Sequence, residues 1–256
     1  MPLERERKFS SPEGHVPSRA ELALSLDDTD FSVDAGRVAR QRDIYFDDAR
    51  GSLRAAGWAL RLRQVAGRTI ATAKSAGRVV GALHEREEIE EEVHIAAAEV
   101  TAANVAPTWP ATILRALEAW VDPTSVVPVV LLDTARIAFT LQKEAGAVVE
   151  LAFDEVRCRL PAGATRPQHG DPSTHDHAPD HASTDTSVGD GRAFDPEALF
   201  HEVEIEAKAG ATDDDLHVID EALAAILTLT PSSVNKLERA LALLGPFRPD
   251  PRANGG

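Results

Sequence analysis

Residues 4–8 read ERERK and set three charged side chains at every second position, with apolar residues on either flank. On a helix Glu4, Glu6 and Lys8 would spread around the cylinder, whereas on a β-strand all three point to one side. A solvated edge strand would show the same pattern. The rest of the chain therefore has to decide whether this charged face meets water or an interior.

The composition excludes several classes of protein. The 256 residues are 43% apolar, enough for a substantial core in one large domain or two small ones. A net charge of −15 argues against general binding to nucleic acid or to anionic membranes, so an anionic ligand needs a local cluster of basic residues. A single cysteine, Cys158, excludes an intrachain disulfide and a multi-cysteine zinc site.

No signal-peptide pattern opens the chain, and nowhere do about 18 apolar residues run together. With the cysteine usage, this predicts a soluble cytoplasmic protein with no membrane partner.

One segment differs from the rest in composition. Residues 162–196 are rich in Pro, Gly, Asp, Ser and Thr, and we expect a disordered insertion in a single domain at 1–247, followed by a disordered tail at 248–256. The histidines and aspartates of residues 162–196 match no closed zinc spacing. A flexible acidic loop is therefore favoured over weak binding of a transition metal. The histidines are His169, His175, His177 and His181.

Periodicity predicts both helices and strands. Helical signals lie at 18–26, 110–121, 212–229 and 232–245. Alternation with period two predicts strands at 2–9, 38–46, 58–65, 69–75, 85–92, 134–142, 147–158 and 200–208. Eight strands are enough to close a barrel.

The predicted strands have one apolar and one charged face. Val203 and Ile205, for example, alternate with glutamates. An ordinary solvated sheet also alternates, but here the charges separate into basic strands and acidic strands. The basic strands carry Arg61, Arg63, Lys74 and Arg136, and the acidic ones carry Glu4, Glu6, Glu150, Asp154, Glu202, Glu204 and Glu206.

Carboxylates at alternate positions of a strand lie roughly 7 Å apart and repel one another unless a proton or a cation intervenes. Oxygen ligands without cysteine favour Mg²⁺ or Mn²⁺ over zinc. Arginine and lysine facing the same space would hold phosphates. If the eight strands close into a barrel with the charged faces inward and the apolar faces under the helices, one lumen meets both needs.

The ERERK stretch resembles the ExExK signature of the CYTH superfamily, the triphosphate tunnel metalloenzymes. That superfamily includes thiamine triphosphatases, inorganic triphosphatases and class IV adenylyl cyclases. Further segments resemble it in the right order: YFDDARGSLRAAGWALRLR (45–63), TAKSAG (72–77), HEREEIE (84–90), HEVEIEAKAG (201–210) and SSVNKLERAL (232–241). The resemblance implies an α+β fold: an eight-stranded antiparallel β-barrel, with a polar interior that forms a tunnel and helices on its flanks. It covers nearly the whole chain except 162–196.

The resemblance also implies roles for individual residues. Glu4 and Glu6 would be catalytic and would bind metal or position water, and Glu202 with Glu204 would be the principal metal pair, with Mg²⁺ or Mn²⁺ as the cofactor. The residues expected to bind substrate are Lys8, Arg61, Arg63, Lys74, Arg136 and Lys236. The supporting acids would be Glu88, Glu150, Glu206 and Asp154, the last also a metal ligand.

Some positions remain open at this level. Lys236 is also compatible with a solvated face of an amphipathic helix, and Lys208 is placed at the rim. The faces of Arg42 and Arg86 are uncertain. His84 and His217 are interpreted as structural or exposed.

Three functions fit these residues. The first is metal-dependent hydrolysis of a triphosphate, which could be tripolyphosphate, thiamine triphosphate or a nucleoside triphosphate. The second is a class IV type adenylyl cyclase, and the third is a module that binds polyphosphate or nucleotide without turnover. Each takes a small-molecule partner rather than nucleic acid, and the sequence does not determine the oligomeric state.

Overall fold

The structure is a computed structural model that describes residues 3–94, 109–122, 125–161, 164 and 197–245. Its strands are β1 (Leu3–Ser10), β2 (Ser32–Val33), β3 (Arg37–Asp47), β4 (Trp58–Val65), β5 (Arg68–Ser75), β6 (Arg78–Val80), β7 (Leu83–Val93), β8 (Val127–Gln142), β9 (Val148–Arg159), β10 (Glu197–Ala207) and β11 (Thr230–Pro231). Its helices are α1 (Arg19–Ser25), α2 (Ser52–Ala55), α4 (Ala111–Leu117), α5 (Asp213–Ala224) and α6 (Lys236–Leu244).

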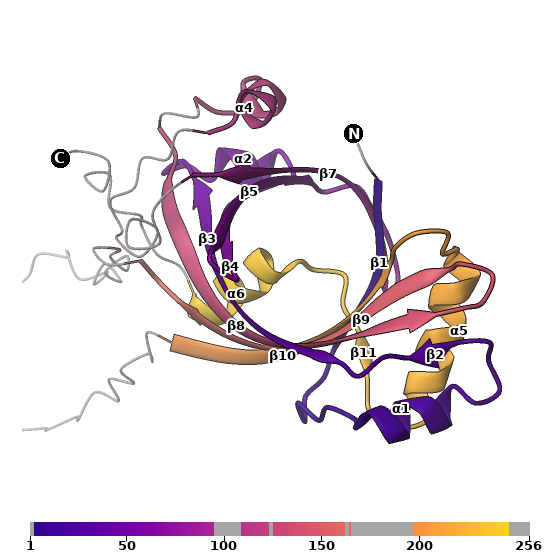
Figure 1. Cartoon of the computed structure of the whole chain (residues 1–256). Helices are drawn as coiled ribbons and strands as arrows, with labels where there is room; N and C mark the ends of the chain where they lie inside the picture. Colours follow the sequence, from indigo (N-terminus) through magenta and orange to yellow (C-terminus); the bar gives the residue numbers. More distant parts are fainter. Residues whose placement is uncertain (1–2, 95–108, 123–124, 162–163, 165–196, 246–256) are drawn as a thin grey trace, which may run out of the picture.

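Eight of the strands close into an antiparallel barrel. They pair in the order β1, β10, β9, β8, β3, β4, β5 and β7, and β7 pairs again with β1 (Figure 1). The short strands β2, β6 and β11 extend the sheet outside this ring. The predicted eight-stranded barrel is therefore confirmed.

Most predicted elements are present, and several of their bounds differ; the helix predicted at 110–121, for example, ends at Leu117. The strand predicted at 134–142 begins at Val127, because the continuous apolar run before it is buried on both faces and does not alternate. The helix predicted at 232–245 begins at Lys236, since Asn235 is its N-cap, in a capping box with Glu238. The helix predicted at 212–229 ends at Ala224.

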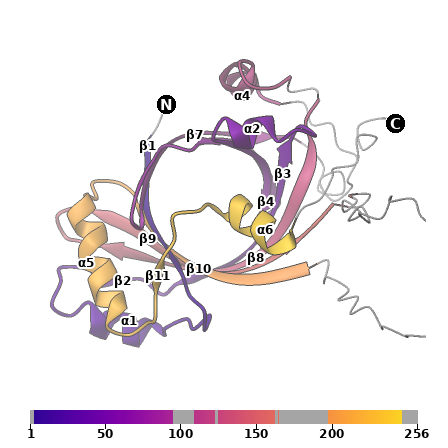
Figure 2. The same ribbon diagram turned by 180° about the vertical axis from the view of Figure 1, so that it is seen from behind.

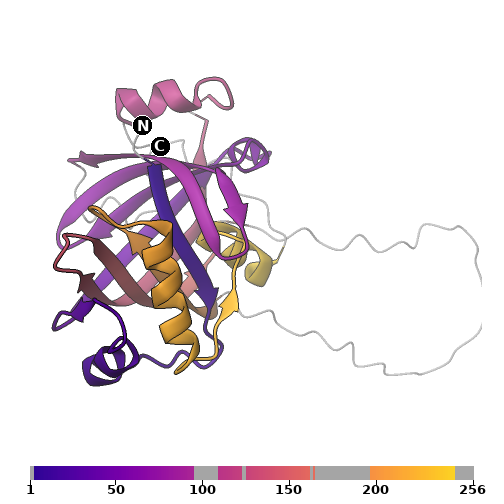
Figure 3. The ribbon, with the colours of Figure 1, turned by 90° about the vertical axis from the view of Figure 1, so that its right-hand side faces the viewer.

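Helices cover two apolar areas on the outer face of the barrel. On one side α1 and α5 pack on the wall through residues such as Leu22, Leu216 and Ile219, all fully buried (Figure 3). On another side α2 and α4 contribute Leu53 and Ile113 to a second cluster against β3, β4 and β5. Because the wall's apolar residues point outward into these clusters, the alternate, charged residues point inward.

The remaining helix, α6, lies across the barrel opening in both end-on views (Figures 1 and 2). Its Leu237, Ala240 and Leu244 pack on Leu132 and Val156, which share the interior face with the charged residues further along β8 and β9. The helix thus seals the apolar end of the tunnel. Its first turn, which begins with Lys236, is directed at the charged part.

No helix among the described residues combines the length and apolarity that a membrane crossing requires. The predicted insertion at 162–196 lies outside the described residues, apart from Ala164, and so does the predicted tail. The domain boundaries therefore stay a prediction.

Candidate active site

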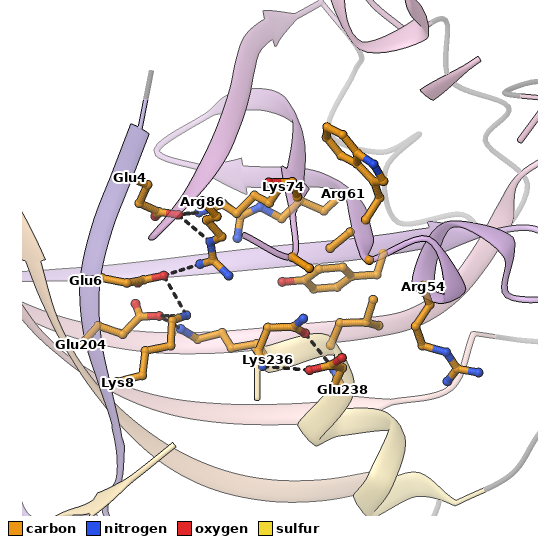
Figure 4. Close-up of a pocket in the computed structure, with 18 of the residues that line it drawn as sticks. Glu4, Glu6, Lys8, Arg54, Arg61, Lys74, Arg86, Glu204, Lys236 and Glu238 are labelled. Atoms are coloured by element: carbon orange, nitrogen blue, oxygen red, sulfur yellow. Dashed lines mark hydrogen bonds and ion pairs between the residues drawn. The ribbon is translucent and has the colours of Figure 1, made fainter. Parts of the chain in front are cut away.

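A cavity of about 90 Å³ lies inside the barrel, and residues from seven strands, α2 and α6 line it (Figure 4). Its charged lining residues are Glu4, Glu6, Lys8, Arg54, Arg61, Arg63, Lys74, Arg86, Arg136, Glu204, Glu206, Lys236 and Glu238. Ion pairs among these side chains fill much of the tunnel. Every residue predicted to bind substrate lines this cavity.

Strand pairing explains why the two acidic motifs meet. In the register of β1 against β10, Glu6 lies opposite Glu206 and Lys8 opposite Glu204. Side chains of directly opposed residues lie on the same face of a sheet. The alternation of ERERK and the alternation of the late acidic strand therefore point into the same space.

Glu204 is the centre of one group of ion pairs. Its Oε1 lies 2.8 Å from the Lys8 Nζ and 2.6 Å from the Lys236 Nζ, and its Oε2 accepts a hydrogen bond from Arg136. Although burial raises the pKa of Glu204, the charges of Lys236 and Lys8 hold it well below its usual range. Glu204 is therefore ionised at neutral pH.

Behind this group lie two more carboxylates that are almost fully buried, Glu202 and Asp154. Asp154 accepts two hydrogen bonds from Arg136, at 2.8 and 2.7 Å. Glu202 lies 2.8 Å from the Lys236 Nζ, yet neither of its carboxylate oxygens accepts a hydrogen bond within the described part of the chain. Burial raises the pKa of Glu202 even against the Lys236 charge.

A second group surrounds Glu4. Its carboxylate accepts hydrogen bonds from the Lys74 Nζ at 2.8 Å and from the Arg86 Nε at 2.7 Å, and Arg86 also donates to Glu6. Burial raises the pKa of Glu4, but the Lys74 and Arg86 charges lower it well below its usual range. Glu88 lies 2.8 Å from the Lys74 Nζ, and burial, opposed by the Lys74 charge, raises the pKa of Glu88 to about 7.

A third group contains a residue that the sequence analysis did not single out, Asp43. Its side chain is completely buried and accepts two hydrogen bonds from Arg63, at 2.7 and 2.9 Å, while the Arg61 guanidinium lies 3.9 Å away. The register of β3 and β4 places Asp43 opposite Arg63. Asp43 thus fixes the two arginines of the LRLR stretch.

Asp43 gives the protein a pH-dependent contribution to stability. Burial raises its pKa, but the charges of Arg63 and Arg61 overcome this and lower it from 3.8 to about 2. A carboxyl group whose folded pKa is depressed stabilises the fold above its unfolded pKa, and this contribution is lost as pH falls towards the folded value. We expect Asp43→Asn to lower the free energy of unfolding by roughly 2 kcal/mol at pH 7.

The difference in unfolding free energy between wild type and Asp43→Asn should narrow as pH falls from about 4 to about 2, the interval between the unfolded pKa of 3.8 and the folded pKa of about 2. Urea unfolding of both proteins at several pH values measures this difference in the free energy of unfolding. A difference that stays constant down to pH 3 would contradict the charge-based role of Asp43.

The carboxylates of the tunnel are its candidate ligands for a divalent cation. Within the described ranges no three acidic, histidine or cysteine side chains converge as a ready-made metal site, and lysine and arginine groups lie between the carboxylates. The donors are nevertheless carboxylate oxygens, the ligands that Mg²⁺ and Mn²⁺ prefer, and the two oxygens of Glu202 lack aligned donors. The residues therefore fit such a cation, provided that the ammonium groups exchange partners.

The remaining predicted residues occupy the periphery of the site. Glu150 lies 3.5 Å from the Arg136 Nη1, and the Glu206 carboxylate lies 2.5 Å from the Lys208 Nζ.

Lys236 is only 5% exposed, so its alternative interpretation as a solvated helix position is wrong. Arg86, whose face was uncertain, points into the tunnel.

Three further residues, Arg42, His84 and His217, are not among those that line the tunnel cavity. Arg42 pairs with Asp133 and does not line the tunnel cavity. His84 is buried, with its Nε2 2.8 Å from the Ser232 carbonyl oxygen, and His217 is exposed on α5. The structural or exposed interpretation of the two histidines is confirmed.

Comparisons with known proteins agree with this geometry. The model of the CYTH domain family matches residues 2–241. An adenylyl cyclase candidate from Hippeastrum, described as having a dominant triphosphatase activity, has a similar structure with a TM-score of 0.56 and 17% sequence identity, over 93% of this chain and 95% of that one. An adenylate cyclase candidate from Bacillus halodurans gives a TM-score of 0.50 at 18% identity, over 93% and 98%. At these identities the likeness concerns the fold. A comparison with curated proteins gave no match.

Proposed function

Because this chain belongs to the CYTH domain family, we propose that it is a cytoplasmic triphosphatase that hydrolyses a small-molecule triphosphate or polyphosphate with Mg²⁺ or Mn²⁺. The observation that carries the proposal is the enclosed convergence of two sets of charges. Acids from β1 and β10 and cations from β1, β4, β5, β7, β8 and α6 line a single cavity. A phosphate chain with its metal carries both charges that such a lining complements.

Substrate binding would exchange ion pairs rather than create new buried charges. Lys8, Lys74 and Arg86 already lie in the tunnel with carboxylate partners. Phosphate oxygens would replace those carboxylates as hydrogen-bond acceptors, so the cost of desolvating the cations is met when the protein folds. This preorganisation favours the transition state, in which charge shifts along the phosphate chain.

Glu202 and Glu204, with Asp154, would hold the divalent cation, whose chemistry is to neutralise charge on phosphate oxygens. The carboxylates of Glu4 and Glu6 would be freed from Lys74 and Arg86 as these bind phosphate. An ionised carboxylate then accepts a hydrogen bond from water and orients its oxygen towards the terminal phosphorus.

A substrate panel tests the proposal. Purified protein is incubated with tripolyphosphate, thiamine triphosphate or ATP, with Mg²⁺ or Mn²⁺ or with EDTA, and orthophosphate, pyrophosphate and cyclic AMP are measured. We expect orthophosphate release that depends on the metal. Cyclic AMP with pyrophosphate would show a cyclase instead, and tight binding without any product would show a binding module.

The Hippeastrum protein, which shares the fold, is described as having a dominant triphosphatase activity. That description supports testing hydrolysis before cyclisation.

A further inference from the structure

Arg54 is a cation of the cavity that differs from all the others. It comes from α2, the short helix between β3 and β4, and not from the barrel wall or from α6. The other cations that line the cavity each lie within 4.0 Å of a carboxylate. Within the part of the chain that the structure describes, no ion pair joins Arg54 to a carboxylate, and its side chain is exposed.

The backbone of Arg54 is nevertheless firmly held. Its N–H donates to the Asp47 Oδ2 at 3.1 Å, and the N–H of Leu53 donates to the Asp47 Oδ1 at 2.9 Å. Asp47 is itself buried, and the Leu53 side chain is fixed in the apolar cluster beneath α2. Arg54 thus has a fixed backbone at the edge of the tunnel, and its guanidinium has no carboxylate partner among the described residues.

The position of Arg54 along the tunnel gives it a specific task. Figure 4 shows Arg54 on the opposite side of the cavity from Glu4 and Glu6, with Lys236 and Lys74 between them. A phosphate chain that begins beside the catalytic acids meets the paired cations first and reaches Arg54 only with its far end. Arginine binds phosphate oxygens through a planar fork of N–H donors.

We propose that Arg54 binds the phosphate group of the substrate that lies furthest from Glu4, and so makes affinity depend on the length of the phosphate chain. This inference rests on the proposed function and names a further binding residue for it. Two sources supply such a group: the terminal phosphate of a longer inorganic chain, and the phosphate that carries the organic part of a nucleotide.

The test measures binding without turnover. Isothermal titration in EDTA at fixed ionic strength compares pyrophosphate, tripolyphosphate, tetrapolyphosphate and ATP on wild type and Arg54→Ala. The matched control is Arg50→Ala, because Arg50 is equally exposed in the turn that leads to α2 but does not line the cavity. Neither change removes a buried group, so both variants should fold.

We expect Arg54→Ala to weaken binding of the longest chains roughly five- to tenfold and of pyrophosphate less than twofold. Arg50→Ala should leave all four ligands within twofold. A loss confined to tetrapolyphosphate identifies an inorganic chain as the source, and a loss confined to ATP identifies a nucleotide. An equal loss at every chain length, an equal loss in Arg50→Ala, or no loss at all would overturn the proposal.

Failure of the proposed function gives a different result. In that case the wild type releases no phosphate from any substrate in the panel, while the length dependence of binding can still be measured.

Discussion

Glu4→Gln is expected to lower metal-dependent phosphate release by roughly 100-fold or more, because glutamine keeps the shape of the side chain and removes its charge. Glu4 holds Lys74 and Arg86 in the free protein and, in the proposed mechanism, orients water or metal once they bind phosphate. The loss should appear mainly in kcat. Phosphate release with Mg²⁺ and with Mn²⁺ measures it.

Glu87→Gln provides the control for this prediction. Glu87 lies on β7 next to Arg86, but its side chain is exposed and is not among the residues that line the cavity. Its activity should remain within twofold of wild type. Thermal melts establish that both variants fold. Unchanged phosphate release in a folded Glu4→Gln variant would remove the role assigned to Glu4.

Lys236→Met is expected to lower the free energy of unfolding by about 3–5 kcal/mol, because it leaves buried carboxylates without their counter-charge. The Lys236 Nζ lies 2.6 Å from Glu204, 2.8 Å from Glu202 and 3.1 Å from Asp154. A methionine fills a similar volume but supplies no charge. Denaturant unfolding of both proteins measures the loss.

Two comparisons sharpen this second prediction. Arg157→Met removes an ion pair that lies outside the tunnel, with Glu155 at 3.2 Å, between side chains that are 55% and 43% exposed, and should cost only about 0–1 kcal/mol. Mg²⁺ should stabilise Lys236→Met more than wild type, since a divalent cation can take the place of the lost ammonium among the carboxylates. Equal stability of Lys236→Met and wild type, or an equal response to Mg²⁺, would contradict the assigned environment.

Much of the barrel could be predicted because alternation is a local property. Glu4, Glu6 and Lys8 share a strand face wherever that strand is placed, and so do Glu202 and Glu204. The same rule placed Arg61 and Arg63 on the charged face of their strand and Lys74 on the charged face of the next one. The alternation of apolar and polar residues fails in the first half of β8. There both faces are apolar, because one packs on α6 at the barrel opening and the other on helices outside the barrel.

Other parts of the site depend on long-range register. Asp43 was missed because its importance comes from standing opposite Arg63 on the neighbouring strand, which one strand alone does not reveal. Lys236 was ambiguous because its burial depends on α6 turning into the barrel opening, and an amphipathic helix on the outer wall would have the same pattern. The sequence alone likewise did not predict the placement of α2, and with it of Arg54.

By itself, the sequence determined which residues share a strand face and that acidic residues predominate on some strand faces and basic residues on others, because side-chain direction follows from backbone geometry. Only the tertiary structure decided that these faces point inward, which carboxylate each cation meets, and that α6 closes one end. Those outcomes depend on ring closure through the pairing of β1 with β7 and on helices that bury the apolar faces outside, and both join residues that are far apart in the chain.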